Sequence, residues 1–317
     1  MIKFSVIVPV YNTYDFLDKC LDSIVDQTVS REKYEIIIVN DGTPDNSEEI
    51  ILKYKEKYPK TIKYIKKENG GLSSARNEGI KHVEGEYIVL VDSDDYLDKH
   101  LFEMLEAHIE GNHKPDVVRI NSRDVKIDGT TIQEVIIKKS RDEIELLKNV
   151  MQANALEVPW AYVYKTSFFK KENFKYEHKI HEDYGLTPII LYKAEKISYL
   201  NYIGYNYVER EGSIMAETKY EKMKQRVDDM FYLYKIHMET IKKDTKKGKL
   251  LRGYSLEAML SKLTFLNKED LDIKLKEVKD YIDASDIYCY NFKKMLKKTV
   301  LVLNIKLYLN LYRKYKF

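Results

Sequence analysis

Strand-like segments alternate with amphipathic segments along the first hundred residues. They cover residues 4–10, 35–41, 61–67 and 86–95, and the first two are typical of strands that are buried on both faces of a parallel sheet. After the first strand-like segment, apolar side chains recur at helical spacing: Phe16, Leu17, Cys20, Leu21, Ile24 and Val25. Strands that alternate with helices predict right-handed βαβ units. We therefore expect an α/β fold, with a doubly wound, mostly parallel sheet and helices on both faces.

The middle third of the chain is less regular. Its apolar segments predict one helix, over 182–194, and four strands, at 116–126, 131–139, 158–169 and 196–210. Ser140 and Glu143 have the spacing of a capping box, which predicts the start of a further helix there. Strand patterns fade beyond about residue 215, and Lys-rich helical patterns continue to the end. With 317 residues, the chain has room for two domains. We expect an α/β domain over 1–215 and a helical C-terminal region over 216–317.

Composition excludes several classes of protein. Charged residues are 33% and hydrophobic ones 44%, which indicates a soluble globular protein. No run reaches the roughly 18 to 20 apolar residues of a membrane-spanning helix, and the amino terminus is typical of a strand and not of a signal peptide. Cys20 and Cys289 lie far apart and outside any metal or redox spacing, so we expect a cytoplasmic protein. The net charge of +3 gives no indication of a nucleic-acid partner, and we expect none.

Basic residues concentrate at the C-terminal end. Residues 291–317 carry a charge of +8 without any acidic residue, which leaves a net charge of −5 on residues 1–290. Within this tail, the apolar block 299–312 would form a helix about 21 Å long, shorter than the roughly 30 Å core of a bilayer. Two interpretations remain open. The tail lies at the inner face of the cell membrane as a peripheral contact, or it packs on the helical region or on a second subunit of a homo-oligomer.

Unusual polar residues lie at the carboxyl ends of the predicted strands, where open α/β sheets bind ligands. The four ends read Pro9-Val10-Tyr11-Asn12, Asn40-Asp41-Gly42, Asn69-Gly70-Gly71 and Asp92-Ser93-Asp94-Asp95. Neither a G-x-G-x-x-G fingerprint nor a P-loop is present in the sequence, so dinucleotide and ATP sites of those types are not expected.

The last of these strand ends places Asp92, Asp94 and Asp95 within four residues. Like charges so close together are costly unless a cation neutralises them, and hard oxygen donors favour Mg²⁺ or Mn²⁺. The alternative is the acidic first turn of a helix. Tyr11 and Asp41 also have two interpretations. They are a stacking face and a hydrogen-bond acceptor for a nucleotide base, or a packing residue and a turn residue.

Together the motifs resemble the family 2 inverting glycosyltransferases of GT-A fold, of the bacterial surface-polysaccharide type. The resemblance is carried by V-P-V-Y-N, V-N-D-G-T-x-D-x-S (39–47), N-G-G-L-S-x-A-R-N (69–77), V-D-S-D-D (91–95), H-E-D-Y-G (181–185) and Y-V-E-R-E-G-S-I (207–214). It covers about residues 1–215, so it implies a GT-A domain followed by a helical subdomain.

The resemblance also implies a role for individual residues. The uracil of a UDP-sugar would be held by Pro9, Tyr11 and Asp41. Further contacts to the nucleotide and the donor sugar would come from Asn12, Asn69, Gly71, Arg76, Asp92 and Ser93. The principal metal ligand would be Asp94, and the general base would be Asp183, supported by Glu182. The diphosphate leaving group would be contacted by Arg210 and Ser213.

This resemblance implies a metal-dependent reaction, with Mn²⁺ or Mg²⁺, that moves a hexosyl or N-acetylhexosaminyl group. The donor would be a UDP-sugar, and the acceptor a hydroxyl of a glycan or a lipid-linked acceptor in cell-envelope polysaccharide synthesis. An inverting transfer is a single displacement, so it needs one base and no covalent intermediate.

Several alternatives remain. Without the resemblance, Asp183 is equally well an acidic residue of a helix first turn, and Trp160 is equally well a core residue or the floor of an acceptor site. His181 more simply packs or hydrogen-bonds than binds metal. Two other functions are a sugar nucleotidyltransferase, which the missing Gly-rich loop disfavours, and a non-catalytic nucleotide- or sugar-binding module, which the retained carboxylates disfavour.

Overall fold

The computed structural model describes residues 2–210, 219–287, 289 and 291–315. By its internal contacts the chain forms two units. The first contains the described residues up to His178 and those from Lys193 to Arg210. The second contains Lys179 to Tyr192 and the described residues from Lys219 onward. The segment 179–192 thus groups with the C-terminal helices, whereas the domain boundary near residue 215 stays a prediction.

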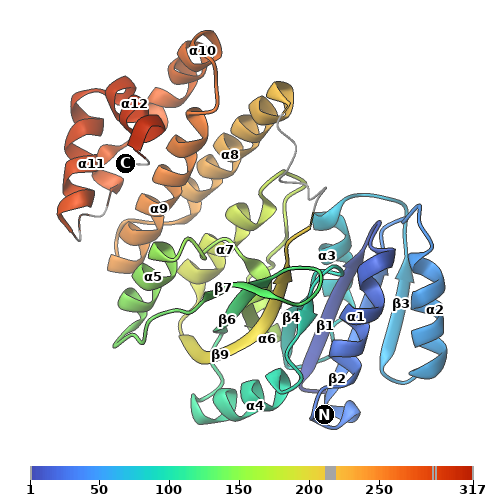
Figure 1. The fold of residues 1–317 in the computed structure, drawn as a ribbon. Coiled ribbons are helices and arrows are strands. Elements are labelled where there is room, and N and C mark those ends of the chain that lie inside the picture. Colours follow the sequence, from blue (N-terminus) through green and yellow to red (C-terminus); the bar gives the residue numbers. More distant parts are fainter. Residues whose placement is uncertain (1, 211–218, 288, 290, 316–317) are drawn as a thin grey trace. The chain divides into compact units, whose positions relative to one another are not determined.

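Four parallel strands form one half of the sheet in the first unit (Figure 1). They lie in the order β3-β2-β1-β4, with bounds β1 (Phe4–Val10), β2 (Tyr34–Asn40), β3 (Ile62–Lys66) and β4 (Tyr87–Leu90). The register pairs Val10 with Asn40, and Asn40 with Lys66, so the segments that follow these strands meet at one edge. The parallel arrangement predicted from the apolar runs is confirmed. The fourth strand was predicted over 86–95 but is shorter, since it covers only Tyr87–Leu90.

The other half of the sheet is mixed. It contains β8 (Tyr162–Lys165), β6 (Val117–Val125), β9 (Ile197–Val208), β5 (Tyr96–Leu97) and β7 (Thr131–Val135). Of these, β9 runs parallel to β6, while β8, β5 and β7 are antiparallel to their partners. The strand predicted over 158–169 is only partly correct. A 3-10 turn at Pro159–Ala161 precedes β8, because Pro159 cannot donate a ladder hydrogen bond. After β8 the chain continues as α6 (Thr166–Lys171).

Helices cover both faces of the parallel half, as predicted. On one face, Val6 and Val8 of β1 share an apolar core with α1 (Tyr14–Val25), α2 (Ser47–Lys57) and α4 (Leu101–Gly111). On the other face, α3 (Leu72–Lys81) approaches so closely that a Cβ on Gly79 would lie 2.6 Å from Ile7 Cγ2. Because successive strand residues point to opposite faces, Val6 and Ile7 mark these two layers.

One helix start differs from the prediction. The N-cap of α5 (Glu143–Gln152) is Asp142, whose side chain accepts a hydrogen bond from Glu145 N at 2.8 Å. The Glu145 carboxylate in turn accepts from Arg141 N at 2.8 Å. The capping box predicted for Ser140 and Glu143 is therefore wrong by two residues, because an aspartate one turn before Glu145 caps the helix instead.

The second unit is helical, as the Lys-rich patterns predicted. Its helices are α7 (Glu182–Lys193), α8 (Tyr220–Thr240), α9 (Lys246–Leu263), α10 (Lys268–Val278), α11 (Phe292–Leu303) and α12 (Ile305–Tyr315). Their shared apolar core includes Val227, Phe231, Leu256, Leu260 and Tyr308.

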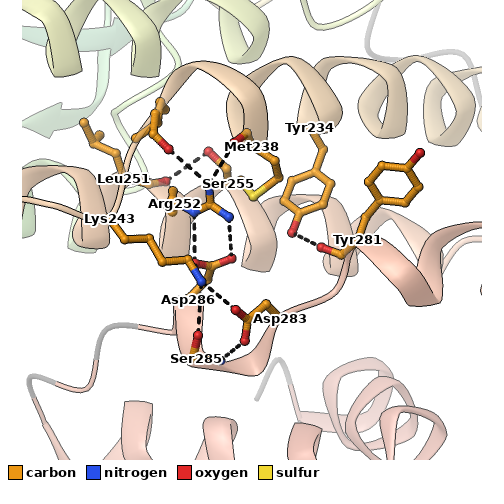
Figure 2. Close-up of polar contacts among 11 residues, drawn as sticks. Tyr234, Met238, Lys243, Leu251, Arg252, Ser255, Tyr281, Asp283, Ser285 and Asp286 are labelled. Atoms are coloured by element: carbon orange, nitrogen blue, oxygen red, sulfur yellow. Dashed lines mark hydrogen bonds and ion pairs between the residues drawn. The ribbon is translucent and has the colours of Figure 1, made fainter.

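A buried charged cluster fastens three parts of this unit (Figure 2). The Asp286 carboxylate accepts hydrogen bonds from Arg252 Nε at 2.9 Å and from Arg252 Nη2 at 3.2 Å, and it pairs with Lys243 Nζ at 2.8 Å. Arg252 also donates to the carbonyl oxygens of Met238 and Ile241, which lie at the end of α8. A bidentate arginine–carboxylate pair of this kind fixes the relative orientation of the two side chains. The cluster therefore joins α8, α9 and the turn around Asp286 as a structural element.

Candidate functional site

At the carboxyl edge of the parallel strands, the turn after β2 packs against the loop after β3. Gly42 has φ +66°, in the left-handed region, and a Cβ there would lie 2.8 Å from the backbone nitrogen of Asn69. Glycine is therefore required for this close approach. The hydroxyl of Thr43 accepts a hydrogen bond from Asn12 N at 2.8 Å, which ties the same turn to the end of β1. The structure thus brings the predicted residues Asn12 and Asn69 to one edge.

Asp41 is the hub of this edge. Its carboxylate is almost fully buried and accepts hydrogen bonds from Gly70 N at 3.0 Å and from Gly71 N at 2.7 Å. It also pairs with Lys67 Nζ at 2.6 Å. A carboxylate has about four lone-pair positions, and Gly70 N is shared between Oδ1 and, at 3.2 Å, Oδ2. Three donors therefore occupy the carboxylate, which leaves it acceptor capacity for one further donor.

Two other residues predicted for the base site differ in exposure. The Tyr11 side chain is 48% exposed and its ring is free to receive a flat ligand. Pro9 is buried within β1, where its register partner is Val39 of β2, so it belongs to the strand that carries Tyr11.

Gly71 has φ +82° and forms the N-cap of α3, and a Cβ there would meet open space.

Two aspartates after β4 are each paired with an arginine. Arg76 Nη2, on the buried side of α3, donates to Asp92 Oδ1 at 2.8 Å. Arg210 Nε, just beyond β9, donates to Asp94 Oδ2 at 2.7 Å. Burial, together with the negative charge of Asp92, raises the pKa of Asp94, and Arg210 opposes that rise. The two carboxylates therefore lie close enough to repel one another, and the arginines compensate part of this repulsion.

The third aspartate of the cluster has a structural role. Asp95 is buried, and its carboxylate accepts hydrogen bonds from the Tyr205 hydroxyl at 2.7 Å and from Val208 N at 2.8 Å. The Tyr205 hydroxyl also accepts from Asp92 N at 3.1 Å. Asp95 and Tyr205 together hold the turn that carries Asp92 against β9. Both contacts join residues more than a hundred positions apart, which is why the sequence pattern did not single out Tyr205.

Ser93, which was predicted to contact the donor, is nearly inaccessible. Its hydroxyl accepts a hydrogen bond from Thr13 Oγ1 at 3.0 Å, and only 4% of the residue is exposed. This bond connects the turn after β4 to the N-cap of α1. A donor-contacting role for Ser93 stays a prediction, and Ser213 lies outside the described residues.

A cavity of about 1080 Å³ opens beside Arg210. Its lining includes Asn12, Tyr14, Phe16, Asp45, Ile127 and Arg210. The Arg210 guanidinium lies 5.4 Å from the centre of the Phe16 ring. Sequence reasoning had selected only Asn12 and Arg210 from this set. The cavity leaves space in which the Arg210 side chain can turn away from Asp94.

Trp160 belongs to the core of the first unit. Its ring stacks on Tyr205 at 4.1 Å between centroids and on Tyr207 at 5.9 Å, and it is 9% exposed. Of the two interpretations left open for Trp160, the structure supports the core residue. Its contact with Tyr205 places it directly behind the turn that carries the aspartates.

Glu182 and Asp183 form the first turn of α7, in the second unit. Asp183 Oδ1 accepts a hydrogen bond from Tyr184 N at 2.8 Å. The helix is fixed by two buried contacts: the Tyr184 hydroxyl donates to the Ser255 carbonyl at 3.0 Å, and His237 Nε2 lies 2.9 Å from the Gly185 carbonyl. Because these contacts lie within the first turn of α7, they hold the backbone that carries Asp183.

His181, immediately before α7, is a buried and neutral residue. Burial lowers its pKa to about 3, and the positive charges of Lys262 and Arg226 contribute to the change. Its backbone has φ +70°, which is uncommon for a residue with a Cβ and costs energy. The positive φ turns the chain into the helix, and the burial of the side chain agrees with a packing role for His181.

Lys67 is a residue that sequence reasoning missed. It follows β3 and forms the ion pair with Asp41 described above. A basic residue two positions before the N-G-G motif was the available signal, but lysines are frequent in this part of the chain. Only the fold shows that this particular lysine turns toward the strand end.

Comparison with known proteins identifies related chains. The model of the family "Glycosyl transferase family 2" matches residues 5–185. This chain is 34% identical over 238 residues to the glycosyltransferase GlyA of Streptococcus pneumoniae, which covers 72% of this chain and 34% of that protein. It is 31% identical over 219 residues to the poly(ribitol-phosphate) β-N-acetylglucosaminyltransferase TarS of Staphylococcus aureus, with 68% and 37% covered. The chain spans only 24% to 62% of the length of the first curated relatives it matches.

Solved structures share the fold along the whole chain. Residues 1–349 of S. aureus TarS in complex with UDP-GlcNAc superpose with a TM-score of 0.69 at 22% identity, covering 99% of this chain and 92% of that chain. The mannosyltransferase PcManGT of Pyrobaculum calidifontis, in complex with GDP-Man and Mn²⁺, gives 0.53 at 12% identity, with 99% and 87% covered. The predicted GT-A fold is thereby confirmed, and the likeness includes the C-terminal helices. Because the family model matches more than half of its residues, the chain belongs to glycosyl transferase family 2.

Proposed function

We propose that this chain transfers a sugar, with inversion, from a UDP-sugar to a hydroxyl of a glycan or lipid-linked acceptor in bacterial surface polysaccharide synthesis. The observation that carries the proposal is the edge where Asp92 and Asp94 are each paired with an arginine. That edge is joined through α3 to the loop held by Asp41. Membership of the family supports the reaction class, and the UDP-GlcNAc complex of TarS supports the donor class.

The contacts suggest how the base is held. The exposed Tyr11 residue offers a stacking surface, and the remaining acceptor capacity of the Asp41 carboxylate suits a base N–H donor. Lys67, at 2.6 Å from the same carboxylate, adds a cationic donor beside that acceptor. An acceptor next to a donor complements the N–H and the carbonyl oxygen of uracil. Cytosine would place a lone pair opposite Asp41 and an amino group opposite Lys67.

The donor set at the Asp92–Asp94 turn fits a divalent ion that the donor diphosphate completes. Both carboxylates are hard oxygen donors, and Mg²⁺ and Mn²⁺ commonly bind one or two carboxylates together with substrate phosphates. Within the described residues, no group of three His, Cys, Asp or Glu side chains is arranged to hold a metal by itself. Asp94, with Asp92, would hold the ion. When bound, such an ion supplies positive charge that stabilises the leaving diphosphate.

Protein groups would provide the remaining chemistry. Asp183, on the first turn of α7, would accept the proton of the acceptor hydroxyl, with Glu182 in support. Arg210 would exchange its contact with Asp94 for one with the diphosphate, and the adjacent cavity gives it space to do so. Each of these groups acts on charge or on a proton, and none forms a bond to the sugar.

The test is release of UDP from a panel of UDP-sugars, with Mn²⁺ or Mg²⁺ present. Release of UDP with inverted configuration in the product is the expected result. Release of pyrophosphate would identify a nucleotidyltransferase, and tight UDP binding without turnover of any donor would identify a binding module. Either of these two outcomes would contradict the proposal.

The Asp183→Asn variant tests the base. UDP affinity should be unchanged, whereas transfer should fall by roughly 10²- to 10⁴-fold, as is usual when a general base is lost. Glu195→Gln, an exposed acid-to-amide change just beyond α7, serves as the matched control and should keep full activity. Near-normal transfer by Asp183→Asn would remove Asp183 from the mechanism.

A further inference from the structure

The turn between α11 and α12 exposes a group of large apolar side chains. Val302 and Leu303, at the end of α11, are 65% and 74% exposed. Met295 and Leu296 lie seven residues before them, on the same helical stripe, and Leu307 lies one turn into α12; each is more than 40% exposed. We call Met295, Leu296, Val302, Leu303 and Leu307 the apolar corner. Single exposed apolar residues are ordinary, but several of them gathered along one helical stripe and the following turn indicate a contact surface.

The apolar corner is not needed for the packing of its own unit. The apolar block once expected to be one helix is divided at Asn304, whose side chain caps α12 by accepting from Leu307 N at 3.0 Å. Leu301, Tyr308 and Leu309 point inward and belong to the helical core. The block therefore has two faces. One face packs on the unit, as the second interpretation of the tail required, and the other face is presented outward on a capped turn.

Unpaired lysines accompany the outward face. Lys293 lies one helical turn from Leu296, and Lys298 lies one turn from both Met295 and Val302. Neither lysine has an acidic partner among the described residues, whereas Lys294 and Lys297 are paired with Glu257. The sequence from residue 291 to 315 contains no acidic residue, so α11 and α12 themselves contribute only positive charge around the apolar corner.

We propose that the apolar corner docks this chain on an anionic lipid bilayer. Apolar side chains at a helix turn can enter the headgroup boundary while neighbouring lysines contact lipid phosphates. No helix among the described residues is long and apolar enough to cross a membrane. A second copy of the chain is a poorer occupant, because a two-fold contact would bring Lys293 and Lys298 of one copy against the same lysines of the other. This proposal does not depend on the proposed activity.

The experiment is co-sedimentation of the full chain with vesicles. Vesicles containing phosphatidylglycerol should bind the protein, binding should weaken at high salt, and vesicles of phosphatidylcholine alone should bind little. Val302→Ser combined with Leu303→Ser should lower partition at least about tenfold, because two protruding side chains are removed. Lys293→Glu combined with Lys298→Glu should lower it by at least a similar factor, because each lysine near an anionic surface contributes to binding.

A matched control removes exposed apolar surface elsewhere. Leu52→Ser combined with Met104→Ser changes two exposed apolar side chains on α2 and α4, which are 50% and 37% exposed, and it should leave partition unchanged. Equal binding by the wild type and both corner variants would refute the proposal, as would failure of the wild type to bind anionic vesicles. An oligomer that becomes monomeric in the Val302→Ser, Leu303→Ser variant would assign the apolar corner to a second copy instead. UDP affinity, measured in parallel, bears only on the proposed function.

Discussion

Replacing Asp41 with alanine should release the loop after β3 from the end of β2. In the native chain the carboxylate accepts from Gly70 N and Gly71 N and pairs with Lys67 Nζ at 2.6 Å. Both glycine amides lose this partner in the variant, whereas Lys67 Nζ keeps its contact with the Glu68 carbonyl oxygen. Hydrogen bonds to a charged group contribute about 1.5–3 kcal/mol each, but the glycines are exposed and can turn to water. We therefore expect a local loss of about 2–3 kcal/mol in total.

Hydrogen exchange at Gly70 and Gly71 measures this loss directly. A local free-energy change of 2–3 kcal/mol corresponds to exchange that is roughly 30- to 150-fold faster at these two amides. Asp41→Asn should show most of the effect, because its NH₂ group replaces an accepting oxygen and would face the N–H groups that now donate to Asp41. UDP affinity should fall by at least about tenfold, since the loop that carries Asn69 and Gly71 loses its fixed position.

Two further variants sharpen the test. Lys67→Met removes the cation but keeps both glycine contacts, so exchange at Gly70 and Gly71 should stay near the native rate while discrimination between UDP and CDP weakens. Asp18→Ala removes a carboxylate from an exposed ion pair with Lys53, at 3.3 Å, and should change neither exchange nor binding. If Asp41→Ala exchanges at these amides as slowly as Asp18→Ala, the hub role assigned to Asp41 is wrong.

Other predictions concern the rest of the site and the stability of the second unit. Tyr11→Ala should weaken UDP binding by the roughly 1–3 kcal/mol of base stacking while leaving its metal dependence intact, and calorimetry with and without Mn²⁺ checks both. Asp94→Ala should abolish the gain in UDP affinity that Mn²⁺ gives; an unchanged gain would reject Asp94 as the ligand. Burial lowers the pKa of His181 to about 3 and that of His237 to about 4, so the unfolded chain binds protons that the native chain does not. Stability should therefore decline as pH falls from about 6.5 toward 4, by about 2 kcal/mol per histidine at pH 5. Urea unfolding at pH 7.5 and pH 5 measures this, and His181→Gln should remove about half of the decline.

The parallel half of the sheet could be predicted because its signal is local. Each predicted strand is a short segment that ends in polar residues, and parallel topology then places all four ends at one edge. The same reasoning located Asp41 and Asp94 without any knowledge of their partners. Lys67 and Tyr205 escaped notice because their roles arise from contacts 26 and 110 positions away. No short-range pattern encodes such contacts.

The tail illustrates a different kind of limit. Sequence reasoning treated 299–312 as one helix and asked whether it is buried or exposed. The structure breaks it at Asn304, a residue whose side chain competes with the helix by capping the next one. Two short helices have two directions, so Tyr308 and Leu309 are buried while Val302 and Leu303 are exposed. Treating residues 299–312 as one uniformly apolar helix therefore described neither the buried face nor the exposed face.

Charge balance links the separate contacts of the proposed donor site. Asp41, Asp92 and Asp94 each have one cationic partner, namely Lys67, Arg76 and Arg210. These three pairs are neutral in sum before any ligand arrives. A diphosphate would add negative charge beside carboxylates that already repel one another, and it would compete with Asp94 for the positive charge of Arg210. A divalent ion held by Asp94 and Asp92 would meet both demands, because it would offset the charge of Asp94 and supply positive charge to the phosphates. From the pairing of Asp94 with Arg210 we therefore predict that UDP binding depends on a divalent metal.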